Sequence, residues 1–286
     1  MDIRQKKIAL LVMFLSLVIL ADPVSASDLK LWNKTIIFLP EKLENIFPRL
    51  YADPFDTQMG LTKKLNVNQL IGRIGQNVYL FHFIPSSDGD AKDTKGMYLA
   101  MTGYSWTLLS REGNRFPLMA VDYLLAGFFD FYYHEAAIRL EYSHISGHLG
   151  DKFASEDIDI LPRVYSREFI SGYASITVEP FIAYGGIHFI YHSIPKVKLV
   201  NLQGGLMFGL GDHVLEGNSP YFAIDLQAIG EFNYFINTSI QVGARLFYQN
   251  QRDYRLAVTY YNGYSVFGQY YDRKRKYISA GFYLDY

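Results

Sequence analysis

The sequence predicts an all-β protein, a transmembrane antiparallel up-and-down β-barrel of about 12 strands, within a range of roughly 10 to 14. Three observations lead to this class. The C-terminal segment alternates strictly between apolar and polar or small residues. The composition is rich in tyrosine, phenylalanine and glycine but poor in charge. Long strand-like segments separated by turn residues fill most of the chain.

The C-terminal segment 276–286 ends in Tyr286 and carries apolar side chains at its even positions. Successive side chains on a strand point to opposite faces, so one set would face lipid and the other the lumen. This ending resembles the signal that the barrel-assembly machinery reads on bacterial outer-membrane proteins, and the resemblance makes that machinery an expected partner. A soluble antiparallel sheet is the alternative interpretation. The expected lipid-facing residues are Ile278, Ala280, Phe282, Leu284 and Tyr286, and the expected lumen-facing residues are Ser279, Gly281, Tyr283 and Asp285.

The N-terminus has the pattern of a secretory signal peptide over residues 1–26. Basic residues precede an apolar run over residues 8–20, and Val24-Ser25-Ala26 provides small residues for cleavage after Ala26. The apolar run is shorter than the roughly 20 residues that a membrane-spanning helix needs. The chain has no cysteine, which excludes disulfides, thiolate metal sites and a cysteine nucleophile. The expected location is the outer membrane of a Gram-negative bacterium.

The composition agrees with a barrel in a membrane. The chain has 24 Tyr and 21 Phe, 19% charged residues and a mean hydropathy of +0.01. Aromatic girdles combined with a polar lumen produce such a balance, because half of each strand faces lipid and half faces water. The formal net charge is −1, so no excess of basic residues points to nucleic acid.

Residues 27–54 differ from the rest and are predicted to form a periplasmic arm or a plug-like segment. They contain an apolar run at 36–39 and three prolines, Pro40, Pro48 and Pro54. A short helix over 41–46 is expected, because Pro40 suits a first helical turn. The barrel itself is predicted over 55–286. Its expected strands are 55–65, 69–84, 96–110, 115–131, 134–148, 160–174, 176–192, 196–212, 218–232, 236–249, 253–270 and 276–286.

The strand 134–148 carries the main chemical motif. If no bulge intervenes, His144, Ser146 and His148 continue its lipid-facing row, where polar side chains are costly unless they lie at the interface or have a function. Residues two apart on a strand point the same way, so His144 can accept the proton of Ser146 while Ser146 attacks an ester. We assign the acid that orients His144 to Asp157. The candidates for this role are Glu156, Asp157, Asp159 and Glu168.

The sequence His144-Ile145-Ser146 resembles the H-x-S pair of outer-membrane phospholipase A and of the lipid A 3-O-deacylase. In those families the pair lies on the lipid-facing wall near the outer leaflet. The resemblance therefore implies a serine lipid hydrolase. Both families follow the serine with asparagine, whereas this chain has Gly147, so a role of that asparagine is missing here. An interfacial belt of histidines is the alternative.

Two longer blocks resemble a bacterial family of secreted proteins of unknown function, which are predicted outer-membrane barrels. These blocks are Tyr142–Asp151, with its H-x-S-x-H-L-G-D stretch, and Phe47–Pro54, with its L-x-A-D-P stretch. Lys152 stands where the family has an acid. The resemblance makes the motif a family feature, and it implies no assigned activity.

Metal binding is an alternative use of the same region. His144 and His148 share a face but lie about 13 Å apart between Cα atoms on an extended strand, too far to bind one ion. A strand that ends near Ser146 would shorten this distance and bring in Asp151. Calcium at the acidic loop 156–159 is a second alternative. No resident cofactor or metal is therefore predicted. On strict alternation, His188 and His192 share one face of the strand 176–192.

Counting strands back from Tyr286, with both termini in the periplasm, places the loop before the last strand outside the cell. Its cations would bind lipopolysaccharide phosphates, each contributing about 1 kcal/mol, unless they only keep the loop solvated. The predicted lipid-binding residues are Arg273, Lys274, Arg275 and Lys276.

Two function classes remain. The first is a non-enzymatic barrel, either a narrow channel or a structural protein. Its expected lumen residues mix both signs and would fill much of the lumen: Arg73, Arg139, Glu141, Asp225 and Glu231. The second is an outer-leaflet esterase that deacylates phospholipid or lipid A through His144 and Ser146. Its partners would be outer-membrane lipids and lipopolysaccharide.

Overall fold

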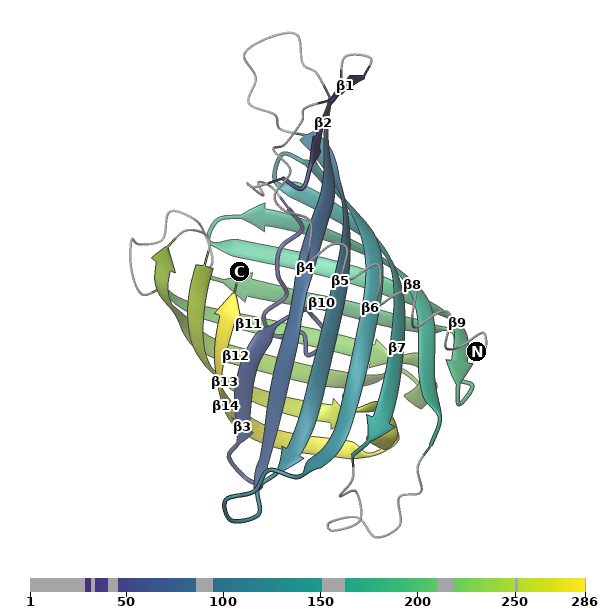
Figure 1. Ribbon diagram of the computed structural model, residues 1–286, viewed down its shortest axis with the longest axis vertical. Helices are drawn as coiled ribbons and strands as arrows, with labels where there is room; N and C mark the ends of the chain where they lie inside the picture. Colours follow the sequence, from purple (N-terminus) through teal and green to yellow (C-terminus); the bar gives the residue numbers. More distant parts are fainter. Residues whose placement is uncertain are drawn as a thin grey trace.

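The described part of the chain folds into a closed antiparallel barrel of twelve strands (Figure 1). The computed structural model describes residues 29–31, 34–40, 46–85, 95–150, 163–209, 219–249 and 252–285. Each barrel strand pairs with the next along the chain, and β14 pairs with β3 to close the ring. The predicted fold class is confirmed. The barrel strands are β3 (Met59–Lys64), β4 (Gln69–Pro85), β5 (Lys95–Ser110), β6 (Leu118–Tyr133), β7 (Ala136–Leu149), β8 (Tyr165–Val178), β9 (Phe181–Ile194), β10 (Val200–Phe208), β11 (Ser219–Ile229), β12 (Phe235–Gln249), β13 (Arg252–Tyr264) and β14 (Lys274–Asp285).

All twelve predicted strands overlap a barrel strand, and the largest difference lies where β13 ends. The predicted strand 253–270 ends at Tyr264, and the predicted strand 218–232 ends at Ile229. Short 3-10 helices follow, η1 (Gly230–Phe232) after β11 and η2 (Gly268–Tyr270) after β13. Aromatic residues continue past both strand ends and pack there, with the rings of Phe232 and Tyr264 stacked. The strand-like composition therefore extends beyond the strands.

The two faces of the wall differ in polarity. We call the end where β14 begins the outer end and the end where β14 finishes the inner end. On β14, Ile278 and Phe282 are exposed outward, whereas Ser279 and Tyr283 are buried in the lumen, as the alternation predicts. Large apolar side chains are exposed outward on the other strands as well, and soluble monomers rarely expose such continuous apolar surface. No helix in the described ranges is long and apolar enough to cross a membrane.

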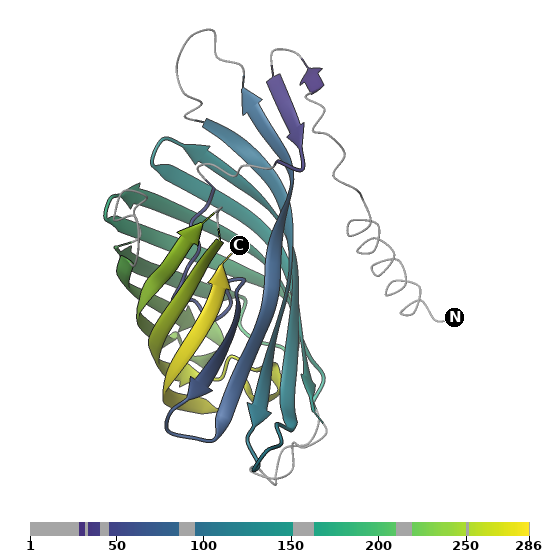
Figure 2. The same ribbon diagram turned by 60° about the vertical axis from the view of Figure 1, so that its left-hand side comes forward.

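A hairpin precedes the barrel at the inner end. Strands β1 (Leu29–Leu31) and β2 (Lys34–Phe38) pair with each other, and β2 pairs with the last residues of β4 (Figure 2). The pairing of β2 with β4 is possible because β3 has 6 residues and β4 has 17, so the end of β4 extends past β3 and can pair with β2 instead. The sequence did not predict this hairpin, since the apolar run at 36–39 is too short to identify a partner.

Residues 46–58, which we call the lumen segment, run inside the ring of strands (Figures 1 and 2). Phe47, Leu50 and Tyr51 are buried against the wall. The guanidinium of Arg139 lies 4.9 Å from the Phe47 ring, and that of Arg255 lies 3.8 Å from the Tyr51 ring. The predicted helix at 41–46 falls largely outside the described residues.

A second segment, residues 265–273, folds inward at the outer end, and we call it the cap. The indole N–H of Trp106 donates to the Val266 carbonyl at 3.0 Å. The backbone N–H of Gly268 donates to Asp122 at 2.6 Å, and the Gln269 amide donates to the Gly147 carbonyl at 2.7 Å. These bonds pin the cap to β5, β6 and β7, so the lumen contains chain at both ends.

Candidate functional site

The predicted pair His144 and Ser146 lies on the outward face of β7, near its outer end. β7 is unbroken from Ala136 to Leu149, so His144, Ser146 and His148 point the same way, while Ser143, Ile145 and Gly147 point into the lumen. The His144 side chain is 40% exposed. The site therefore opens to the surroundings of the barrel and not to the lumen.

A carboxylate stands beside His144. Glu168 lies directly opposite His144 in the β7–β8 register, and its Oε1 is 3.5 Å from His144 Nδ1. Its Oε2 is 3.8 Å from Nδ1 of His192 on β9. Glu168 thus lies between two imidazoles across three adjacent strands. It was one of four acidic candidates in the sequence, and the other three, including Asp157, lie outside the described residues.

A β-bulge brings His192 to this face. The β8–β9 register pairs Glu168 with His192 and then Phe169 with Ile190, so Tyr191 is an extra residue on β9. A bulge shifts the alternation by one position. His188 consequently lies in the lumen while His192 is exposed outward, and the prediction that they share a face is wrong. Strict alternation contains no signal for such an insertion.

Ser146 has a hydroxyl-bearing residue opposite it on each side. The register pairs it with Tyr123 on β6 and with Ser166 on β8. Side chains directly opposite on neighbouring strands have Cβ atoms about 4.5–5.5 Å apart. Within the described residues, Ser146 and His144 are not joined by a hydrogen bond, so a proton transfer between them requires His144 to turn toward the serine. Apo sites commonly tighten in this way when substrate binds.

Two tyrosines lie further from the outer end on the same face. The Tyr191 hydroxyl donates to the Tyr142 hydroxyl at 2.8 Å, and their rings stack at 6.1 Å. Leu140 lies below Tyr142 on β7 and Ile170 lies opposite Tyr142 on β8, and both side chains are about half exposed. Aromatic residues commonly mark the membrane interface. The polar row thus lies just above an aromatic and apolar surface.

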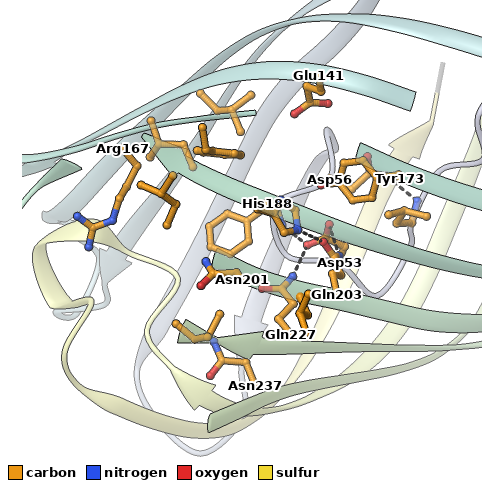
Figure 3. A pocket seen from close by; sticks show the side chains of 18 of the residues that line it. Asp53, Asp56, Glu141, Arg167, Tyr173, His188, Asn201, Gln203, Gln227 and Asn237 are labelled. Atoms are coloured by element: carbon orange, nitrogen blue, oxygen red, sulfur yellow. Dashed lines mark hydrogen bonds between the residues drawn. The ribbon is translucent and has the colours of Figure 1, made fainter. Parts of the chain in front are cut away.

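The lumen holds a cavity of about 160 Å³ between the lumen segment and the outer end (Figure 3). Aromatic rings, amides and charged groups line it together. Its acidic lining residues are Asp53, Asp56, Glu141 and Glu231, and its basic ones are Arg139 and Arg167. Arg139 forms a bidentate pair with Asp130 at 2.7 and 2.8 Å, and Arg167 pairs with Glu231 at 3.1 Å.

A protein family and several solved structures are similar to this chain. The family described as "Protein of unknown function (DUF1207)" matches residues 99–286. The chain belongs to the DUF1207 family. This stretch includes His144, Ser146 and Glu168, which we call the wall site. The wall site therefore lies within the region that matches the family. No curated protein matches the sequence.

Solved structures similar to this DUF1207 protein are outer-membrane barrels. Outer membrane phospholipase A from Escherichia coli has a TM-score of 0.50 at 13% identity, covering 82% of this chain and 93% of that one. The outer membrane phospholipase of Salmonella typhi, solved as a dimer with bound calcium, has a TM-score of 0.50 at 14% identity, covering 86% and 95%. At these identities the likeness shows the fold alone.

The remaining predicted residues of this DUF1207 protein are distributed as follows. Asp151 and the acidic loop 156–159 lie outside the described residues. Among the residues that are described, no three His, Asp or Glu side chains are placed to hold a metal ion. In the basic stretch, alternation separates the cations: Lys274 and Lys276 are exposed outward, while the guanidinium of Arg275 lies 5.7 Å from the Tyr270 ring of the cap.

Proposed function

We propose that this DUF1207 protein is a serine esterase of the Gram-negative outer membrane that cleaves acyl esters of outer-leaflet lipids. The contact between His144 and Glu168, with Ser146 next on the same outward row, carries the proposal. A nucleophile, a base and an acid that orients the base are the parts that acyl transfer needs. The signal-peptide pattern of residues 1–26 and the aromatic C-terminus support export and insertion in that membrane.

The chemistry follows from the positions of these groups. Glu168 engages Nδ1 of His144, which leaves Nε2 to accept the Ser146 proton as the hydroxyl attacks the ester carbonyl. Collapse of the tetrahedral intermediate releases the alcohol part of the lipid, protonated by His144, and leaves an acyl-serine. Water, deprotonated by His144, then hydrolyses the acyl-serine and releases a fatty acid. The opposite hydroxyls of Tyr123 and Ser166 are the side-chain donors placed to stabilise the oxyanion.

The surroundings favour a lipid substrate over a soluble one. The acyl chain of a lipid would lie along the apolar surface around Leu140 and Ile170, with its ester at the level of Ser146. Phospholipid and lipid A both present esters at this depth, and the exposed Lys274 and Lys276 would attract the phosphates of either. A permanently open channel is disfavoured, because the lumen segment packs against the wall inside the barrel and narrows the lumen.

The test is acyl release by the refolded protein in mixed lipopolysaccharide–phospholipid micelles, read by mass spectrometry with and without calcium. We expect fatty acid release that Ser146→Ala and His144→Ala both abolish. Ser143→Ala is the matched control, because Ser143 lies on the same strand but points into the lumen. Release that persists in Ser146→Ala, or its absence in a protein shown to be folded, would rule out the esterase.

A further inference from the structure

The lumen segment is attached to the wall through two carboxylates of like charge. Asp53 lies on the lumen segment and Asp225 on β11. The Gln203 amide donates to Oδ2 of Asp53 at 2.9 Å and to Oδ2 of Asp225 at 2.7 Å. The Gln227 amide donates to Oδ1 of Asp53 at 3.0 Å and to Oδ1 of Asp225 at 2.9 Å. Two amide groups therefore bridge the two carboxyls, and Figure 3 shows Gln203 and Gln227 beside Asp53.

The rest of this network supplies hydrogen bonds but no positive charge. The Tyr184 hydroxyl donates to Asp225 at 2.6 Å. His188 bonds Ser171 through Nδ1 and Gln203 through Nε2, at 2.8 and 2.9 Å, which suits a neutral imidazole. Within the described ranges, neither Asp53 nor Asp225 has an ion-pair partner. Both are nearly fully buried, and two adjacent buried carboxylates cannot both ionise without strong repulsion.

We propose that the barrel is also a gated pathway for small cations, and that the lumen segment is its gate, latched to the wall where the amides of Gln203 and Gln227 bridge Asp53 and Asp225. The cavity above the latch reaches the outer end at Arg167, Glu231 and Tyr271. The lumen segment separates this cavity from the inner end. Its lining has four acidic and two basic side chains, so the pathway favours cations over anions.

The stability of the docked lumen segment depends on pH in a defined direction. Asp53 lies on the lumen segment and not on a membrane-spanning strand, and burial together with the charge of Asp225 raises its pKa well above the ordinary value. A raised pKa means that docking is stabilised at low pH, and that this stabilisation is lost as pH rises through the raised value. The gate is therefore closed in acid and loosens as the medium becomes alkaline.

Other titratable groups surround Asp53, and each bears on this response. Asp56 on the same segment adds to the repulsion at Asp53, and Arg139 in turn offsets the charges of Asp56 and of Glu141 on β7. Four tyrosines and one histidine complete the surroundings, from four different strands: Tyr104, Tyr173, Tyr184, His188 and Tyr261.

The experiment is planar-bilayer conductance of the full chain between pH 5 and pH 9 under a KCl gradient. We expect a cation-selective current that rises at least tenfold with pH. Asp225→Asn removes the repulsion between the two carboxylates and adds an amide donor for Asp53, so the gate of this variant stays closed at pH 5 and at pH 9. Glu179→Gln is the control, because Glu179 lies in the exposed turn between β8 and β9 and not in the lumen, and it keeps the pH response. A pH-independent or anion-selective current, or an unchanged response in Asp225→Asn, would overturn the gate.

A second measurement, of thiol labelling, tests the gate without relying on insertion of the variant into a planar bilayer. The chain has no cysteine, so Ala52→Cys gives a single thiol on the lumen segment. The rate at which a polar maleimide labels this thiol is measured at one alkaline pH in two proteins, one with Asp225 and one with Asp225→Asn. Because the pH is the same, the ionised fraction of the thiol is the same in both and does not affect the ratio of the two rates. Faster labelling with Asp225 supports the gate, and equal rates contradict it. Neither result depends on Ser146.

Discussion

The outward wall and the lumen hold their carboxylates in different ways. In the lumen, Asp130 forms two bonds of 2.7 and 2.8 Å to Arg139, and Asp225 accepts from Tyr184 and two amides at 2.6 to 2.9 Å. On the wall, Glu168 contacts two half-exposed histidines at 3.5 and 3.8 Å. Short, complete bonds fix a side chain, whereas long contacts leave donors and acceptors for another molecule. The lumen carboxylates are therefore held in place by the protein, and the looser wall contacts fit the role that we propose for them in binding a substrate.

The largest expected effect falls on the wall. Glu168→Gln keeps the size of the side chain but removes the charge that orients His144. We expect kcat for acyl release to fall by about 10²–10⁴, with KM little changed. His192→Gln is the matched control, because it alters the other histidine on Glu168, and it should retain kcat within a few fold. Equal losses in the two variants would contradict the assignment of Glu168 to His144.

The next effect falls on the lumen. Arg139→Met keeps a side chain beside Phe47 and Phe128 but removes the guanidinium that lies over both rings and leaves Asp130 buried without this partner. Breaking a buried pair in this way costs about 3–5 kcal/mol. Urea unfolding of the protein in lipid vesicles measures the loss. Arg163→Met is the comparison, since its pair with Asp272 is exposed and contributes under about 1 kcal/mol. Similar losses would show that the two pairs do not differ.

A smaller effect concerns lipid phosphates at the outer end. The double change Lys274→Ala with Lys276→Ala should weaken binding to lipopolysaccharide by roughly 1 kcal/mol for each lysine, less at high salt. Lys95→Ala is the control, because Lys95 is exposed at the inner end. Binding is read by co-sedimentation with lipopolysaccharide at two ionic strengths. If all three lysines contribute equally, the orientation of the barrel is wrong.

The smallest effect tests the tyrosine pair below the wall site. Tyr191→Phe removes the donor to Tyr142 but keeps the stacked ring, and one such hydrogen bond contributes about 0.5–1.5 kcal/mol. We expect a small loss of stability in unfolding and an activity within about threefold of the parent. A large loss of activity would mean that the tyrosines take part in substrate binding.

The barrel could be predicted from the sequence because alternation is a local signal. Twelve strands and their faces follow from it, including the outward row of His144 and Ser146. The partner of His144 could not be predicted, because the β7–β8 register depends on the long connection between them, and any of four acidic residues could have come opposite. The bulge at Tyr191 and the inward cap at 265–273 leave no local pattern. The Asp53 latch joins residues more than 150 positions apart in the chain.

The last strand closes the ring and also binds the lumen segment. Asp285 receives Arg255 from the neighbouring strand at 2.6 Å and Arg49 from the lumen segment at 3.2 Å. One carboxylate on the last strand thus joins the neighbouring strand and the lumen segment. In terms of assembly, Arg49 can reach Asp285 only when the lumen segment lies inside the ring and β14 is in place. The pair therefore couples the seating of this segment to the placement of the last strand, and a chain whose lumen segment stays outside would leave Arg49 without this carboxylate.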